Sequence, residues 1–330
     1  MWLPEVAVDL ETLEVMAEAG ILFTILAPHQ ASRVREGGSW RDVTGGGFDT
    51  TVPYRCELSS GRSIALFFYN GALANDIAFG NLLENGGTFA GRMIDGARGE
   101  GARLSHAAVD GETFGHHRRF GEMALAYCLE TVEEGGGAEL TVYGEFLEKH
   151  PPTAVVEIIG NTSWSCTHGV ERWRSDCGCR AGDHSEWHQR WRKPLRESLD
   201  RLREEVDRLF EEAGGECFDD PWEARDGYID VLLGGGRPGG RAGDLLEMER
   251  FAMLMYTSCG WFFDDISRIE TVQVLGYAAR AAQLAGEVSG KDVLGPFLKS
   301  LEEVPGNTEE VPDARRALEA AFGERLGIAG

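Results

Sequence analysis

Short apolar runs alternate with segments of helical periodicity through the first half of the chain. The runs are rich in β-branched and aromatic residues, which predicts strands at residues 21–27, 63–69, 104–109 and 154–159. Between them apolar residues recur every three or four positions, which predicts helices at residues 9–19, 72–83, 115–133 and 141–149. Strands that alternate with helices are typical of βα units around a parallel sheet. We therefore expect an α/β fold for this part.

The pattern becomes helical after about residue 190. Leucines and a valine share one face of a segment whose other face is densely charged, which predicts an amphipathic helix at residues 194–213. Further helices are expected at residues 245–256, 269–285, 291–302 and 312–326. The sequence thus predicts an α/β domain at residues 1–190 and an α-helical C-terminal domain at residues 191–330.

The net charge excludes one class of partner. The 330 residues include 55 acidic and 32 basic side chains, a formal net charge of -23 at pH 7, so DNA, RNA or an anionic membrane surface would be repelled. No apolar run approaches the roughly 20 residues of a membrane helix, and the first residues do not resemble a signal peptide. The seven cysteines are odd in number, which favours reduced thiols. We expect a cytoplasmic globular protein that binds neither nucleic acid nor membrane.

The first segment with candidate chemistry is Trp2-Leu3-Pro4-Glu5. A proline-stiffened turn brings an aromatic ring close to a carboxylate ahead of a predicted helix. In a carbohydrate site, the aromatic face would stack on the C–H face of a sugar while the acid works at the anomeric carbon. The alternative is an ordinary helix N-terminus, where acidic residues are favoured by the helix dipole.

The second segment is Val109 to His117, which follows a predicted strand and opens a predicted helix. Side chains at the C-terminal ends of parallel strands face the ligand crevice, so Asp110 and Glu112 occupy positions typical of catalytic groups. The glycines at 111 and 115 allow a tight backbone turn. The alternative is again structural, because Asp is a favoured N-cap and Glu suits the first turn of a helix.

Together these segments carry a resemblance to a known family. Trp2-Leu3-Pro4-Glu5 resembles the nucleophile motif of family 57 glycoside hydrolases, and the segment from Asp110 to Gly115 looks like their acid/base motif. That family has a (β/α)7 barrel and hydrolyses, transfers or branches α-glucans with retention at the anomeric carbon. The resemblance implies that Glu5 is the nucleophile, that Asp110 is the general acid/base, and that no cofactor is needed. The implied substrate is an α-glucan or maltooligosaccharide.

The similarity extends downstream. Residues 162–173 and the later helices look like a subgroup of the family with a helical C-terminal domain of unknown function. The first barrel strands of the family, with a His-containing motif, should precede Trp2 and are absent here. The resemblance therefore implies a partial, N-terminally truncated (β/α)7 barrel followed by the helical domain, and it leaves the activity of this chain alone open.

Contacts to the sugar are expected from aromatic and polar side chains near these motifs. The pair at positions 29 and 30 follows the strand predicted at residues 21–27, at the rim where βα units bind ligands. The expected sugar contacts are Trp2, His29, Gln30, Glu112, Phe114, His116, Trp164 and His168.

A cysteine and histidine cluster is the remaining candidate. Cys166, Cys177 and Cys179 lie near His168 in the sequence, with His184 and His188 close behind, and such thiolates and imidazoles can hold zinc. The Cys-x-Cys spacing differs from the usual Cys-x2-Cys knuckle, and the alternative is a loop that lines the sugar cleft. We expect no metal, with these cysteines as the ligands if one is present.

Two other functions compete with a retaining glycosidase. One is a metal-dependent, deacetylase-like barrel in which Asp110, His116 and His117 bind zinc. The other is a non-enzymatic glucan-binding fragment. The sequence does not predict the glucan linkage, the acceptor or the oligomeric state.

Overall fold

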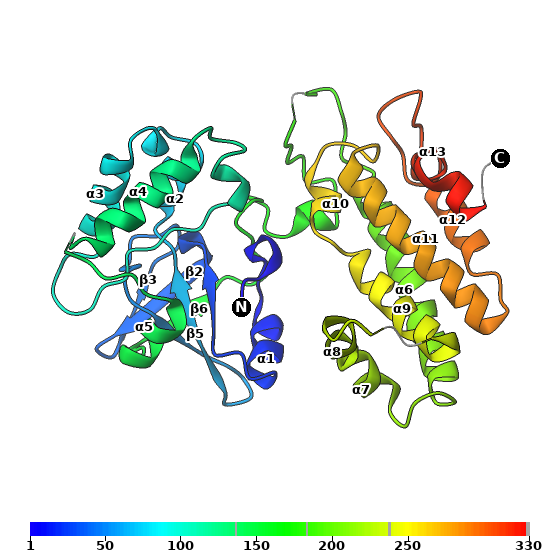
Figure 1. Ribbon diagram of the computed structural model, residues 1–330, viewed down its shortest axis with the longest axis horizontal. Coiled ribbons are helices and arrows are strands. Elements are labelled where there is room, and N and C mark those ends of the chain that lie inside the picture. Colours follow the sequence, from blue (N-terminus) through cyan, green and yellow to red (C-terminus); the bar gives the residue numbers. More distant parts are fainter. Residues whose placement is uncertain (136, 183, 237–238, 328–330) are drawn as a thin grey trace. The chain divides into compact units, whose positions relative to one another are not determined.

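The computed structural model places one sheet in the first half of the chain and helices in the second (Figure 1). It describes all residues except 136, 183, 237–238 and 328–330. The chain divides into two compact units, Met1–Gly169 and Val170–Gly330, whereas the sequence pattern changes near residue 190.

The sheet of the first unit is mixed rather than parallel. Within the described residues it has six strands in the order β1-β5-β4-β6-β2-β3. The pairs β1/β5 and β4/β6 are parallel, and the other neighbouring pairs are antiparallel. The strands are β1 (Phe23–Leu26), β2 (Ala31–Glu36), β3 (Ser39–Asp42), β4 (Tyr54–Glu57), β5 (Ser63–Phe68) and β6 (Ala154–Ile158).

Two hairpins explain why the sheet is not parallel. Gly37 and Gly38 connect β2 to β3 with φ of 63° and 106°, and two such residues favour a tight antiparallel hairpin. A second tight turn joins β4 to β5, where Leu58 N–H donates to Arg62 O at 3.0 Å. Antiparallel strands can follow each other through such short turns, whereas parallel strands need a long crossover.

The strands expected at residues 21–27, 63–69 and 154–159 are confirmed as β1, β5 and β6. The strand expected at residues 104–109 is wrong, since no strand is assigned there. Leu104 N–H donates to Thr51 O at 2.8 Å, and His106 O accepts from Asn70 N–H at 3.1 Å. These bonds reach two different segments and form no ladder, so residues 104–109 do not join the sheet as a strand.

The helices of the first unit begin at polar caps. Asp9, Asn70 and Asn85 each accept a hydrogen bond from a backbone N–H in the first turn that follows. The expected helix at residues 115–133 begins later, at Gly121, because the preceding residues form turns. The helices are α1 (Leu10–Glu18), α2 (Gly71–Ala78), α3 (Gly86–Gly96), α4 (Gly121–Glu133) and α5 (Tyr143–Lys149).

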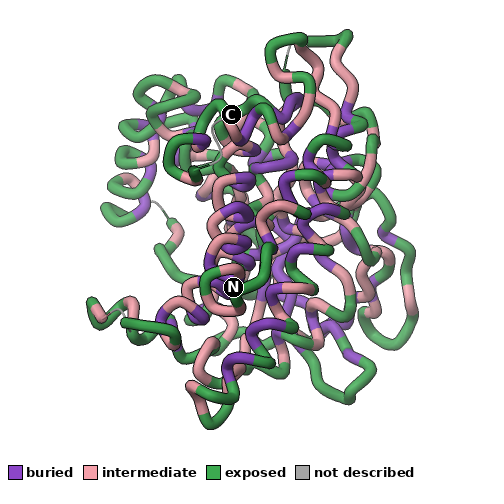
Figure 2. Tube along the Cα trace, turned by 90° about the vertical axis from the view of Figure 1, so that its right-hand side faces the viewer, coloured by how far each residue is buried: buried purple, intermediate pink, exposed green. Residues whose placement is uncertain are grey.

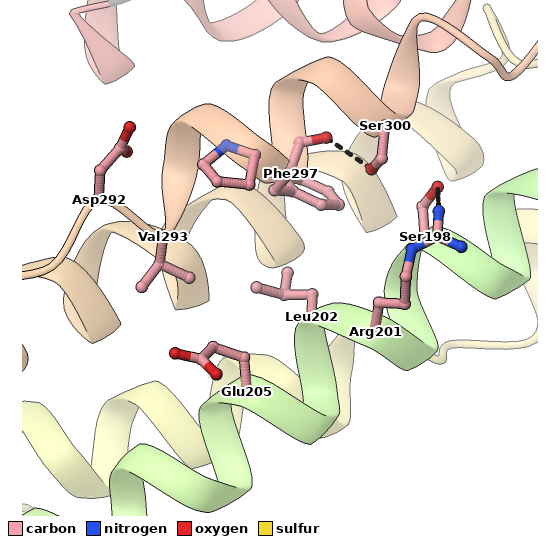
Figure 3. Close-up of a pocket in the computed structure, with 9 residues that line it drawn as sticks. Ser198, Arg201, Leu202, Glu205, Asp292, Val293, Phe297 and Ser300 are labelled. Atoms are coloured by element: carbon pink, nitrogen blue, oxygen red, sulfur yellow. Dashed lines mark hydrogen bonds between the residues drawn. The ribbon is translucent and has the colours of Figure 1, made fainter.

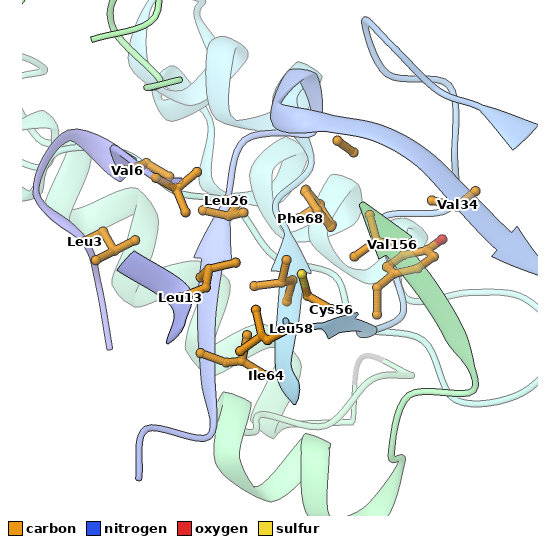
Figure 4. Close-up of a cluster of buried hydrophobic side chains, with 14 of the residues drawn as sticks. Leu3, Val6, Leu13, Leu26, Val34, Cys56, Leu58, Ile64, Phe68 and Val156 are labelled. Carbon is orange, nitrogen blue, oxygen red and sulfur yellow. The ribbon is translucent and has the colours of Figure 1, made fainter. Parts of the chain in front are cut away.

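A hydrophobic core joins α1 to one face of the sheet (Figure 4). Leu13 of α1 packs in the same cluster as Leu26, Phe68 and other strand residues, all fully buried. Leu3 and Val6, which flank Glu5 on either side, belong to this cluster as well. Burial of each such side chain is worth roughly 1.5–3 kcal/mol. The core therefore anchors the turn that carries Glu5.

The second unit is helical in its described residues. The long helices α6 (Arg192–Gly214), α9 (Gly240–Leu254) and α11 (Ile269–Ser289) pack together, and buried and exposed positions alternate along the chain (Figure 2). Five buried alanines of α11 permit close helix contacts. The shorter helices are α7 (Pro221–Asp226), α8 (Tyr228–Leu233), α10 (Cys259–Phe262), α12 (Leu294–Leu301) and α13 (Ala314–Leu326). In the described chain, no helix is long and apolar enough to cross a membrane.

Candidate active site

Glu5 occupies a strained turn. It lies in a short 3-10 helix, Pro4–Val6, and both Glu5 and Val6 have positive φ, 55° and 52°. Such a conformation is rare for a β-branched residue and costs roughly 1–3 kcal/mol per residue. Val6 N–H donates to Leu3 O at 2.9 Å, which closes the turn. Strain of this kind is retained only where the surroundings impose it, and it is concentrated at functional sites.

Gln30 is the side chain that holds this turn. It is fully buried, and its Nε2 donates to Val6 O at 2.8 Å and to Thr162 Oγ1 at 3.1 Å. Its Oε1 accepts from Ala27 N–H at 2.8 Å. The sequence suggested a sugar contact for Gln30, but its amide is engaged inside the protein. Gln30 therefore stabilises the Glu5 turn from inside the protein.

Two donors from one segment orient the Glu5 carboxylate. Ser165 Oγ donates to Glu5 Oε2 at 2.8 Å, and Trp164 Nε1 donates to the same oxygen at 3.3 Å. The backbone pairs as well, because Trp164 N–H donates to Glu5 O at 3.1 Å. Hydrogen bonds to a charged acceptor are stronger than neutral ones. The carboxylate is thus fixed by one oxygen in a defined direction.

Two further aromatic rings pack against Trp164, which bonds this carboxylate. Trp2 and Trp164 meet edge to face with 5.2 Å between ring centroids, and Tyr69 contacts Trp164 from further away, at 6.5 Å. Trp2 is 41% exposed, so it offers an aromatic surface to a ligand close to Glu5. Tyr69 is buried, which raises its pKa to about 12, so it stays a neutral phenol at physiological pH.

Asp110 lies at the second turn that the sequence singled out. It is exposed and precedes the short 3-10 helix Gly111–Thr113, where its carbonyl accepts from Thr113 N–H at 3.0 Å. Its carboxylate makes no side-chain cap, although an N-cap was the structural alternative. Gly115 then turns the chain with φ of 109°, a conformation that favours glycine.

Trp164 connects the two turns. It bonds Glu5, and it also packs in an apolar cluster with Ala27, Tyr69 and Val109. Ala27 and Tyr69 follow directly after β1 and β5, which are parallel, so the cluster lies at the C-terminal ends of these strands. Val109 immediately precedes Asp110. Both motif turns therefore adjoin one cluster at the edge where α/β enzymes carry their active sites.

The remaining expected sugar contacts divide into exposed and supporting residues. His29 is exposed, and its Nε2 lies 3.0 Å from Ser163 O; because a carbonyl only accepts, this nitrogen carries the proton. Glu112 and His116 are exposed, while Phe114 packs against the cluster beneath α3 and α4. His168 is exposed.

Ser165 is a site residue that sequence reasoning missed. It stands within the segment that resembled the family, but no spacing rule indicates a hydroxyl 160 positions away from its partner carboxylate. Tyr69 is likewise absent from the sugar contacts expected from the sequence. Only the folded chain shows which strand ends meet.

Cavities lie apart from these turns. One of about 470 Å³ in the first unit is lined by residues that include His106 and Tyr143, and one of about 240 Å³ lies between α6 and α12 of the helical unit (Figure 3). Neither is lined by Glu5 or Asp110. Asp110, His116 and His117, the zinc ligands of the competing deacetylase hypothesis, are not among the metal-type clusters found in the described residues.

Comparison with known proteins identifies the first part of the chain. Residues 1–159 match the family described as Glycosyl hydrolase family 57. These residues belong to glycosyl hydrolase family 57. Residues 187–237 and 239–322 match a domain of unknown function, DUF3536. The resemblance found in the sequence, both to family 57 and to a subgroup with a helical domain of unknown function, is confirmed.

Two solved structures resemble this chain along nearly all its length. An exo-type maltose-forming amylase from Pyrococcus sp. ST04 has a TM-score of 0.67 at 14% identity, covering 98% of this chain and 63% of that one. The alpha-amylase AmyC from Thermotoga maritima has a TM-score of 0.54 at 13% identity, covering 96% and 64%. No curated protein matches the sequence significantly. The chain thus shares the fold of these proteins and spans less than two thirds of the length of each.

These likenesses confirm the predicted fold class, an α/β domain of the family 57 barrel type followed by a helical domain. The correction concerns strand direction, because the sheet mixes parallel and antiparallel pairs.

Proposed function

We propose that the family 57 domain cleaves or transfers α-glucans with retention, with Glu5 as nucleophile and Asp110 as general acid/base. The observation that carries the proposal is the Glu5 carboxylate, held by Ser165 and Trp164 in a strained turn beside the exposed ring of Trp2. A helix N-terminus that merely favours an acid has no need of positive φ or of two side-chain donors on the carboxylate.

The reaction would proceed in two steps. Glu5 attacks the anomeric carbon and forms a glycosyl-enzyme, while Asp110 gives a proton to the departing glycosidic oxygen. Asp110 then takes a proton from the acceptor, water or a sugar hydroxyl, which attacks the same carbon and frees Glu5. This requires carboxyl groups roughly 5–5.5 Å apart when the substrate is bound. The choice between hydrolysis and glucan transfer depends on the acceptor.

The exposed residues near Glu5 are proposed to bind the substrate. Trp2 offers its exposed ring for stacking on a glucose unit, with Trp164 behind it. His29, Glu112 and His116 are exposed polar residues on the two motif turns or beside them, and they would bond sugar hydroxyls. The two similar structures are those of amylases, which supports an α-glucan as the substrate class.

The test is conversion of maltoheptaose by the full chain, followed by chromatography of the products. Glu5→Gln and Asp110→Asn should each lower the rate by at least about 100-fold, since a positioned acid or base contributes about that much or more. Glu11→Gln, at an exposed position of α1, is the matched control and should leave the rate unchanged. Binding of maltoheptaose without conversion would instead make the chain a glucan-binding protein.

Azide rescue assigns the two roles separately. With α-glucosyl fluoride, which needs no acid to leave, Glu5→Ala in azide should yield the β-glucosyl azide by direct displacement. Asp110→Ala in azide should yield the α-glucosyl azide, because azide then attacks the glycosyl-enzyme. The reverse pattern of products would exchange the two roles. If azide rescues neither variant, neither residue takes part in the chemistry.

A further inference from the structure

The cavity of about 470 Å³ in the first unit is lined by residues of α3, α5 and the segment 102–107. Its volume falls in the range of roughly 300–1,000 Å³ that is typical of small-molecule sites. Neither Glu5 nor Asp110 lines it, so the chemistry proposed above does not use it. We propose that this cavity binds a glucose unit of an α-glucan, apart from the catalytic turns. The choice of ligand rests on the proposed function.

The segment 102–107 is held in place by close contacts. Leu104 N–H donates to Thr51 O at 2.8 Å. On the side of α3, a Cβ at Gly96 would lie 2.5 Å from Ser105 Oγ, so the helix and the segment approach this closely because residue 96 is glycine. The wall formed by this segment is therefore built by the fold itself, as in most small-molecule sites.

Part of the wall is apolar and aromatic. Leu104 and Phe146 line the cavity and pack with Phe67 in one buried cluster. Tyr143, a half-buried lining residue, meets Phe67 edge to face with 5.0 Å between ring centroids. The apolar C–H face of a sugar ring can pack against such a wall, which fixes the ring and leaves its hydroxyl groups at the edge.

His106 and Tyr143 determine the hydrogen bond that the cavity offers. His106 Nε2 lies 2.9 Å from Thr50 O, and because a carbonyl only accepts, Nε2 carries a proton. Burial lowers the pKa of His106, so the ring is neutral at physiological pH and its Nδ1 accepts. Tyr143 therefore donates its hydroxyl proton to Nδ1, 3.0 Å away. The Tyr143 oxygen can then only accept, so it favours a ligand with a hydroxyl donor.

The charges of the wall favour a neutral ligand. The lining cations Arg103 and Lys149 each have an acidic partner, Asp49 at 3.1 Å and Glu145 at 2.6 Å. An anion would therefore find no uncompensated arginine or lysine there, and it would be repelled by the net charge of -23. The same two side chains can still donate hydrogen bonds to neutral oxygens. A sugar supplies both hydroxyl donors and hydroxyl acceptors, together with an apolar face.

Hydrogen-exchange mass spectrometry with maltotriose tests the site in the full chain carrying Glu5→Gln, so that bound glucan is not converted. Peptides that cover residues 93–107 and 139–150 should gain protection that saturates with maltotriose. Ala102→Trp, at an exposed lining position, fills the cavity and should abolish this protection. Ala19→Trp, at an exposed position outside the cavity, is the matched control and should keep it. Absence of protection, or protection that survives Ala102→Trp, would overturn the site.

Two further measurements test the ligand class. Tyr143→Phe removes the acceptor and should raise the Kd for maltotriose in this cavity about 2- to 12-fold, the value of one hydrogen bond. Glucose 6-phosphate should protect the same peptides less than glucose does, and stronger protection would contradict a neutral ligand. The two proposals fail separately: conversion of maltoheptaose without protection here would refute the cavity alone, and protection without conversion would refute the glycosidase alone.

Discussion

Replacing Gln30 with leucine should both destabilise the first unit and impair the Glu5 turn. The change keeps the approximate volume but removes the bonds to Ala27 N–H and Val6 O, both on fully buried residues. Each buried backbone group left without a partner costs about 1–3 kcal/mol, so the free energy of unfolding should fall by roughly 2–6 kcal/mol. That loss is comparable to the strain at Val6, and we expect the turn to relax and the rate of glucan conversion to fall.

Urea unfolding followed by hydrogen-exchange mass spectrometry measures this effect, because it reports peptides of each unit separately. Gln273→Leu makes the same chemical change at an exposed position of α11 and should stay within about 0.5 kcal/mol of the unaltered protein. If Gln30→Leu also stays within that range, the hydrogen bonds of Gln30 do not hold the turn and the reasoning fails.

Gln30→Glu refines the same experiment. One carboxyl oxygen would then face Val6 O, and only the protonated form could donate to it. The carboxyl group should therefore keep its proton in the folded state, and the variant should lose stability as pH rises above the ordinary pKa of a glutamate. Stability of Gln30→Glu that is independent of pH would contradict this arrangement.

Other predictions concern single side chains. Burial, with the nearby negative charge of Asp207, raises the pKa of Glu249 from 4.5 to about 7; the folded state therefore binds this proton more tightly, and stability falls as pH rises from 4.5 to 7. At pH 8, the free energy of unfolding of Glu249→Gln should exceed that of the unaltered protein by up to roughly 3 kcal/mol. The two free energies should converge near pH 4.5, and a constant difference between pH 4.5 and 8 would contradict the assignment. Ser165→Ala should lower kcat/KM about 10- to 100-fold by removing a donor to a carboxylate, and Ser165→Thr should restore most of it; equal loss in both would point to packing instead. Burial lowers the pKa of His106 below its ordinary 6.5, so stability of the first unit falls as pH drops below 6.5, and His106→Gln should flatten that dependence in thermal melts; an unchanged slope would show that another group causes it.

The elements that the sequence predicted well are those whose pattern is local. The long amphipathic helix α6 has leucines on one face, and β1, β5 and β6 are short apolar runs between polar turns. The hairpin strands β2 and β3 were missed because their residues are largely polar, and those of β3 are mostly exposed. Their signal was the Gly37-Gly38 pair, which indicates a tight turn.

In the candidate site, too, the sequence predicted the residues of local motifs but not their distant partners. Glu5 and Asp110 were named from motifs that can be found in the sequence, but the donors that orient Glu5 come from Trp164 and Ser165, far along the chain. The sequence predicted a sugar contact for Gln30, whereas its side chain is buried and hydrogen-bonded inside the protein. A strand-end position does not reveal whether a side chain points into the protein. Burial decides that question, and burial is a property of the folded chain.

The central claim is that Glu5 forms the glycosyl-enzyme, and trapping that species tests it most directly. The full chain is incubated with 5-fluoro-α-glucosyl fluoride, which reacts at the nucleophile and is then released slowly, and the digested protein is sequenced by tandem mass spectrometry. The account predicts a fluoroglucosyl adduct on Glu5, with no adduct in Glu5→Gln. An adduct on another carboxylate, or undiminished labelling of Glu5→Gln, would contradict the account.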